Sequence, residues 1–215
     1  MIRFFNRFSR GNVELDRVGA FSDAIFGIVI TILVLQFAVP TLHNPNSIGE
    51  LANKLVALLP KLVSWFISIV ITCKFWINHY YIFKLARKAN YALVWINCFF
   101  LMSQSFIPFP TALMGEYHEN PLAVTLFGVV MAWNTVMYII LHEYINKKLI
   151  KPEFENAQDP HIIKKSFIGV FSYLAGAAIA WISVYVGFFI YLITPLLFIV
   201  PPRLREDEGV EPPME

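Results

Sequence analysis

Residues 17–37 read RVGAFSDAIFGIVITILVLQF, and this stretch decides the fold. Its first third contains an arginine, a serine and an aspartate, but the stretch as a whole is mostly apolar and reaches the length of about 20 residues that an α-helix needs to cross the hydrocarbon core of a bilayer. Polar and charged groups are costly in that setting, so the few that occur here must have partners or a task. The stretch therefore predicts a membrane helix that carries a functional site.

The composition of the whole chain indicates a membrane protein built from helices. Of 215 residues, 57% are hydrophobic and 15% are charged, whereas an ordinary soluble domain has about 25% charged residues. A net charge of +2 without a basic stripe excludes a nucleic-acid partner. The two cysteines, Cys73 and Cys98, lie in apolar stretches and predict neither a disulfide framework nor a metal site.

Six stretches are apolar enough to span a membrane. The predicted spans cover residues 17–38, 48–83, 91–114, 121–144, 166–186 and 187–201. The second is longer than a span needs and is expected to tilt or to project from one surface. The last two come from one apolar block divided at Gly187, and the short sixth stretch also fits a partly re-entrant segment. Residues 1–203 thus form one transmembrane domain, and the acidic tail 204–215 is predicted to be disordered.

Basic residues set the predicted orientation. Lysines and arginines gather before the first span, between the second and third, between the fourth and fifth, and after the sixth. The intervening segments HNPNS, at 43–47, and GEYHEN, at 115–120, contain none. Because basic loops stay in the cytoplasm, both termini are expected there, in a multi-pass protein of the cell membrane.

The first helix has two distinct faces when about 100° is allowed per residue. Ile32 and Leu35 then fall within about 40° of Ile28 and form an apolar stripe, with Thr31 at its margin. Asp23 points about 140° away from the stripe, so the two must contact different things. The stripe could be lipid-facing or ordinary core, or it could line a pore in which apolar rings gate by dewetting. Periodicity alone does not choose between these.

The motif Arg17-x-x-x-Phe21-Ser22-Asp23, followed by AIFGIVITILVLQF, resembles the signature of the transmembrane protein 175 family. This family comprises endolysosomal-type potassium channels and their prokaryotic relatives. The resemblance continues with FWINHYY in the second span, Asn97 in the third and FIPFPTAL at 106–113. The first motif is fairly specific, whereas the other matches are individually weak.

This resemblance implies a channel of the prokaryotic single-repeat branch, a homotetramer around a central pore lined by the first helix. It places the apolar pore layers at Ile28, Ile32 and Leu35 and a threonine layer at Thr31. No TVGYG filter is present, so a modest preference for potassium among monovalent cations is expected from the apolar neck. The implied partners are other copies of the chain, the lipid bilayer and the permeant ion, with no cofactor.

The polar residues of the first helix are expected to anchor it. The predicted network within one subunit consists of Arg17, Phe21, Ser22, Asp23, Trp76, His79 and Asn97. Separate local bonds are the alternative. His79 also offers a route for pH to act, against the simpler interpretation of a satisfied structural histidine.

Two other function classes stay open, and one is excluded. A membrane scaffold would use the same stripes for packing, and a proton-coupled transporter would use Asp23 and His79 as a relay. Enzyme chemistry has no support, because the second histidine of a zinc-protease helix beginning at His142 would fall on Asn146. His118 with Glu116 and Glu119 fits a solvated loop better than a divalent-ion site. No catalytic or metal residue is predicted.

Overall fold

The computed structural model describes residues 13–154 and 162–196. Within these residues the chain is helical, which confirms the predicted class. The elements are α2 (Leu15–Leu33), η1 (Val34–Gln36), α3 (Ile48–Ala57), α4 (Leu59–Leu85), α5 (Tyr91–Ser105), α6 (Pro108–Glu116), α7 (Pro121–Lys148), η2 (Pro152–Phe154), α8 (Ile162–Ile179) and α9 (Val184–Leu196). The tail 204–215 and the end of the sixth predicted span lie outside the described residues.

Four of the described helical segments are long and apolar enough to cross a membrane. They are Leu15–Val34, Leu59–Leu85, Tyr91–Glu116 and Pro121–Lys148. Val184–Leu196 is apolar but shorter, with 13 residues. The described part of the chain thus has the character of a multi-pass membrane protein.

Two of the predicted spans are divided in the structure. The second ends its first helix at Ala57, and Pro60 lies in the first turn of the next helix, where its missing N–H is not needed. The third is broken between Ser105 and Pro108. Pro108 cannot donate to the carbonyl of Gln104, which instead accepts the N–H of Ile107 at 3.0 Å.

The last two helices meet at residues 180–183, upstream of the predicted division at Gly187. Gly187 lies inside α9, where a Cβ would come within 3.2 Å of the Gly176 carbonyl oxygen. Tyr191 also crosses this contact and donates its hydroxyl to the Val124 carbonyl at 3.0 Å. These glycines therefore mark close helix packing rather than a turn.

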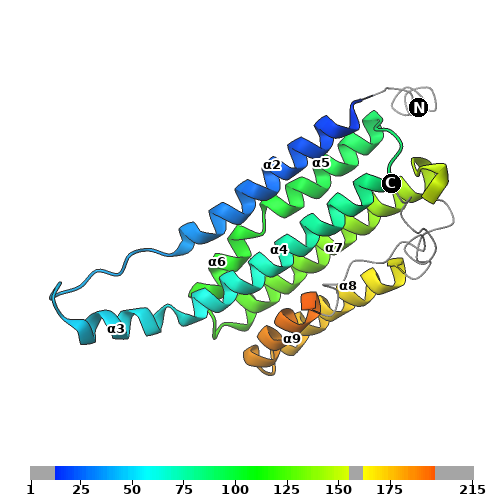
Figure 1. Ribbon diagram of the computed structural model, residues 1–215. Helices are drawn as coiled ribbons and strands as arrows, with labels where there is room; N and C mark the ends of the chain where they lie inside the picture. The colour runs from blue at the N-terminus through cyan, green and yellow to red at the C-terminus, as the bar shows by residue number, and fades with distance from the viewer. Residues whose placement is uncertain (1–12, 155–161, 197–215) are drawn as a thin grey trace, which may run out of the picture.

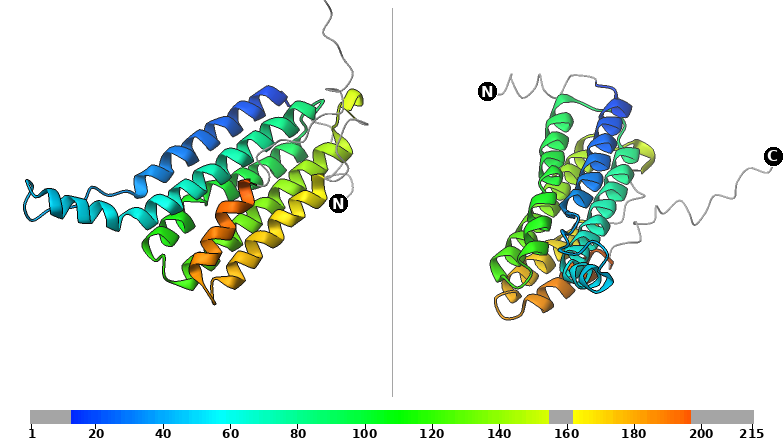
Figure 2. Two further views of the ribbon diagram at one scale, coloured as in Figure 1. Left: turned by 60° about the horizontal axis from the view of Figure 1, so that its bottom comes forward. Right: turned by 90° about the vertical axis from the view of Figure 1, so that its left-hand side faces the viewer.

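The helices form an elongated bundle with α7 at its centre and α2 on its side (Figure 1). In its most apolar window α7 has 61% of residues buried, whereas α2 has 28%. α2 packs on α4 and α5, while α8 and α9 cover the opposite side of α7 (Figures 1 and 2). The first helix consequently keeps a broad exposed face.

Main-chain hydrogen bonds tie together one end of the bundle, which we name the basic end. Val13 donates to Ala89 at 3.2 Å, Arg87 to Leu149 at 2.7 Å, and Lys151 to Leu85 at 3.0 Å. These bonds join the start of α2, the α4–α5 connection and the end of α7. They bring together two of the basic segments identified in the sequence, which contain Arg87 and Lys151.

The opposite, distal end is more open. After η1 the chain runs out along residues 37–47 and returns through α3, which projects beyond the bundle (Figure 1). No residue of α3 is buried. α3 is the first part of the second predicted span, and the expectation that this span tilts or projects from one surface of the membrane stays a prediction.

Candidate pore helix and its anchor

α2 has a buried face and an exposed face, as its sequence period predicts. The buried residues are Val18, Ser22, Phe26, Val29 and Leu33, which follow one another at helical spacing. The predicted stripe lies on the exposed face: Ile28 is 52% exposed, Ile32 43% and Leu35 76%. In a single copy of the chain the bundle covers these apolar side chains only in part.

The end of the stripe differs from the rest of it in backbone geometry. Ile28 and Ile32 belong to α2, whereas Leu35 lies in the short 3₁₀ segment η1. Thr31 is exposed, and its hydroxyl is placed to donate to the carbonyls of Gly27 and Ile28, each at 2.9 Å. Because the hydroxyl proton is directed to the backbone, the oxygen lone pairs of Thr31 are left to face outward.

Three residues of the predicted network form a buried chain of hydrogen bonds. Ser22 Oγ donates to the Val18 carbonyl at 2.8 Å, and Asn97 Nδ2 donates to Ser22 Oγ at 2.9 Å. Asn97 Oδ1 lies 2.9 Å from His79 Nε2. Since an amide oxygen only accepts, His79 Nε2 must carry the proton. The chain links α2 to α5 and α4, and its three side chains are at most 1% exposed.

Aromatic rings enclose His79. Its imidazole stacks on Phe83, with ring centroids 4.1 Å apart, and lies parallel to Phe100 at 5.7 Å. Phe26 of α2 contacts the same imidazole at 5.7 Å. This enclosure fits a histidine whose hydrogen bond is satisfied inside the subunit, and it fits less well a sensor in contact with water.

Asp23 forms a side-chain hydrogen bond outside this buried chain. Its Oδ1 accepts the indole N–H of Trp76 at 2.8 Å, on the exposed side of the α2–α4 contact. Within the described residues no bond joins this pair to the buried chain. Arg17 and Phe21 are both exposed, and neither side chain forms a hydrogen bond or ion pair with a described residue. The predicted group is thus brought together as two units, with Arg17 and Phe21 outside both.

The sequence interpretation misses several buried polar contacts. Ser68 and Thr111 hydroxyls lie 2.7 Å apart between α4 and α6, and Ser103 donates to Asn134 at 2.9 Å between α5 and α7. The spacing of Ser64, Ser68 and Thr72, four residues apart on α4, is the signal that could indicate such a face. It is a weak signal, because short hydroxyl residues are also common where membrane helices merely pack.

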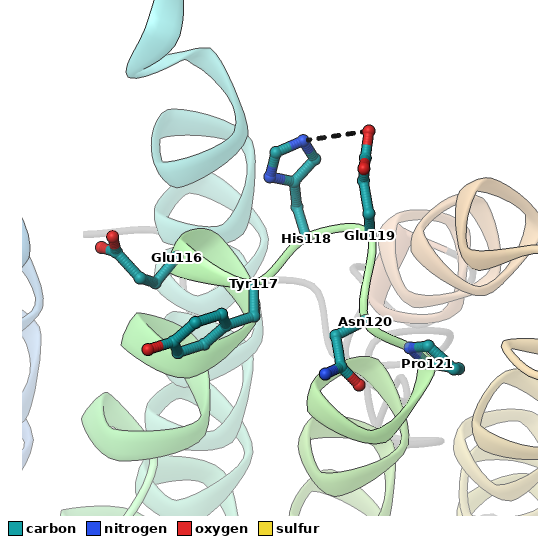
Figure 3. A pocket seen from close by; sticks show the side chains of 6 residues that line it. All are labelled: Glu116, Tyr117, His118, Glu119, Asn120 and Pro121. Carbon is teal, nitrogen blue, oxygen red and sulfur yellow. Dashed lines mark ion pairs between the residues drawn. The ribbon is translucent and has the colours of Figure 1, made fainter.

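The turn between α6 and α7 does not gather its acidic residues around His118. His118 Nε2 lies 4.0 Å from Glu119 Oε1, whereas Glu116 points away from both (Figure 3). Glu116 instead pairs with Lys61 of α4 at 2.5 Å. Among the described residues no group of three His, Cys, Asp or Glu side chains is placed to hold a metal ion.

Comparisons with known proteins identify relatives of the whole chain. Residues 17–108 match the family described as endosomal/lysosomal potassium channel TMEM175. A potassium channel of Chryseobacterium sp. (strain P1-3) is 29% identical over 195 residues, which cover 88% of this chain and 95% of the relative. A potassium channel of Chamaesiphon minutus is 29% identical over 190 residues, 86% of this chain and 93% of that one.

More distant relatives are longer. The endosomal/lysosomal proton channel TMEM175 of Gallus gallus is 23% identical over 195 residues, which make up 38% of its length. The chain thus spans nearly the full length of these two bacterial relatives and about two fifths of the animal one.

The fold agrees with a solved structure. The crystal structure of a lysosomal potassium-selective channel TMEM175 homolog from Chamaesiphon minutus superposes with a TM-score of 0.72 at 28% identity. The superposition covers 86% of this chain and 96% of that one. The sequence match begins at Arg17, the first residue of the motif, and includes the three residues of the predicted stripe and Thr31 beside it. The chain is thus similar to channels of the TMEM175 family, in sequence over residues 17–108 and in fold over 86% of its length.

Proposed function

We propose that this protein is a potassium-preferring cation channel in which four copies surround a pore lined by α2. Two of its bacterial relatives are potassium channels of nearly the same length. The observation that carries the proposal is the exposed apolar face of α2, opposite the face that packs on the bundle. Four such faces around one axis bury what a single copy leaves uncovered.

The pore has apolar layers at Ile28, Ile32 and Leu35 in this proposal. Rings of branched aliphatic side chains exclude water from a narrow neck, and such a neck gates by wetting and dewetting. Thr31 contributes a polar oxygen beside these apolar layers. Because its hydroxyl proton is directed to the backbone, the oxygen is free to accept from water or to face an ion. A potassium ion sheds water more easily than sodium at an apolar neck, which supports a modest preference.

The basic end is proposed to face the cytoplasm. Arg87 and Lys151 lie there, and the α6–α7 turn at the distal end contains no lysine or arginine. Both termini would then be cytoplasmic, with six spans per subunit in the plasma membrane of a prokaryote. The buried chain of Ser22, Asn97 and His79 would hold the cytoplasmic half of the pore helix.

The test is ion flux through purified protein in liposomes. Wild type is expected to dissipate a potassium gradient rapidly, with slower sodium flux. Ile28→Asn, Ile32→Asn or Leu35→Asn is expected to hydrate the neck, raise flux several-fold and lower the preference for potassium. Val34→Asn is the matched control, because Val34 is also 50% exposed but lies off the stripe. Unchanged flux and preference in all three stripe variants would contradict the assigned lining.

The same liposomes separate the other functions. A scaffold gives no flux, and a proton-coupled transporter gives a saturable flux that depends on the proton gradient. Animal relatives carry the name proton channel, so proton permeation through the same neck is a second candidate. A pH-sensitive dye inside the liposomes measures it, and the three asparagine variants are expected to increase it.

A further inference from the structure

Two tryptophans of α4 lie along its contact with the first helix. Trp65 and Trp76 are 11 residues apart, which is about three helical turns and places them on one side of α4. Trp76 is bonded to Asp23 near the basic end of α2. α4 runs antiparallel to α2 (Figure 1), and three turns toward the distal end Trp65 lies against Phe37, the residue that follows η1.

The contact between Trp65 and the end of the pore segment is direct. The rings of Trp65 and Phe37 meet edge to face, with centroids 6.1 Å apart. Phe37 follows Gln36, the last residue of η1. The side chain of Gln36 folds back on the helix end, where its Nε2 donates to the main-chain carbonyl of Leu33 at 2.8 Å.

Trp65 and the neighbour of Phe37, Gln36, each have one polar side-chain atom without a hydrogen bond. Trp65 Nε1 and Gln36 Oε1 are both buried, and neither has a hydrogen-bond partner among the described residues. A buried polar group without a partner costs free energy, so such groups point to a bond that forms in another arrangement. An indole N–H only donates and an amide oxygen only accepts, so these two groups are complementary.

We propose that Trp65 and Gln36 form a distal latch, in which Trp65 Nε1–H donates to Gln36 Oε1 in a second arrangement of η1. The latch repeats, three turns away, the bond that Trp76 makes to Asp23. A 3₁₀ turn has weaker hydrogen bonds than an α-helix, and residues 37–47 beyond η1 are not helical. The turn can therefore move without displacing α2.

The latch would affect the pore by changing the position of Leu35. Leu35 precedes Gln36 in the same turn and is 76% exposed, so closing the latch re-aims Leu35. This consequence rests on the proposed function, because it takes Leu35 to line the pore. Trp65 and Gln36 are positioning residues that act through Leu35 and do not touch the ion.

A double-mutant cycle on potassium flux tests the latch. Trp65→Phe removes the donor and keeps an aromatic ring, and Gln36→Met removes the amide at similar length. Each is expected to change flux by about two- to tenfold, the size that one hydrogen bond supports. The double variant is expected to change it no further than the larger single effect. Effects that multiply instead would overturn the latch. Trp95→Phe, an exposed tryptophan of α5, is the matched control and leaves flux unchanged.

An NMR measurement tests the same bond without conduction. The indole N–H signal of Trp65 in detergent-solubilised protein is assigned by its loss in Trp65→Phe. With the latch present, Gln36→Met shifts this signal and speeds its hydrogen exchange, while the signal of Trp76 stays in place. If Gln36→Met leaves the Trp65 signal and its exchange rate unchanged, the latch is contradicted, even if wild type conducts potassium. If wild type shows no potassium flux, the proposed channel function is contradicted instead.

Discussion

The two halves of α2 are held in different ways. Toward the basic end, Ser22 joins a buried chain of side-chain hydrogen bonds, and Asp23 is bonded to Trp76. Beyond Phe26, toward the distal end, the buried face of α2 offers only Val29 and Leu33, and the helix passes into a 3₁₀ turn. All four proposed pore residues, Ile28, Thr31, Ile32 and Leu35, lie in or beyond this second half.

This difference separates the anchor of the helix from its working part. Inside a membrane apolar packing gives little preference for one rotation of a helix, whereas a hydrogen-bonded chain fixes it. The anchor therefore sets which face of α2 turns away from the bundle. The distal half keeps the freedom that the proposed apolar gate needs.

Removing the centre of the anchor has the largest expected effect. Asn97→Leu leaves the Ser22 hydroxyl and the His79 N–H without their side-chain partner in the core. Loss of partners for two buried groups is expected to lower stability by about 2–4 kcal/mol. Thermal unfolding in detergent measures it, with Asn78→Leu as control, because Asn78 is only partly buried on α4. Equal melting temperatures for the two variants would mean that the anchor is not held by these bonds.

The sequence predicts the faces of α2 better than its partners. The stripe follows from a period of about 3.6 residues, so periodicity alone places Ile28 and Ile32 on one face. The side-chain partner of Ser22 is Asn97, which lies 75 positions away in the chain, and only the family resemblance suggests this pairing. Arg17 belongs to the predicted network through its motif, although its own rotation around the helix follows the stripe.

The helix breaks show a second limit of the sequence. Pro108 is visible near the end of the third predicted span, but a proline in a membrane helix can bend it, break it or be accommodated. Gly187 is compatible with a turn, whereas in the fold it permits close packing against Gly176. Both outcomes depend on what lies across the interface, and a single sequence does not contain that.

A smaller effect is expected at the distal end, where α6 packs closely on α4. A Cβ on Gly115 of α6 would stand 3.0 Å from the Lys61 Cα, a backbone atom that yields only if α4 moves. Gly115→Ala is therefore expected to destabilise the protein by about 1–3 kcal/mol. Gly49→Ala is the matched control, since nothing lies within 4 Å of its added Cβ in α3. If thermal unfolding showed Gly115→Ala as stable as wild type, α4 and α6 would be less tightly apposed than they are here.

The smallest effect is local and depends on pH. At the projecting distal segment, Glu50 accepts the backbone N–H groups of His43 and Asn44 at 2.8 and 3.1 Å. These bonds, that of His43 first, lower the pKa of Glu50 below its ordinary value. A lowered pKa means that the charged form stabilises the fold, so the contribution is present at neutral pH and is lost as pH falls below about 4.

Hydrogen exchange of the His43 and Asn44 amides reports this change. Their protection, corrected for the intrinsic pH dependence of exchange, is expected to fall below about pH 4 in wild type. In Glu50→Gln the neutral amide oxygen still accepts but does not titrate, so protection is weaker and independent of pH in this range. Because α3 has no buried residue, the unfolding temperature of the bundle is expected to stay the same. A parallel loss of bundle stability would show that the distal segment is coupled to the anchor, and the two halves of α2 would then not be independent.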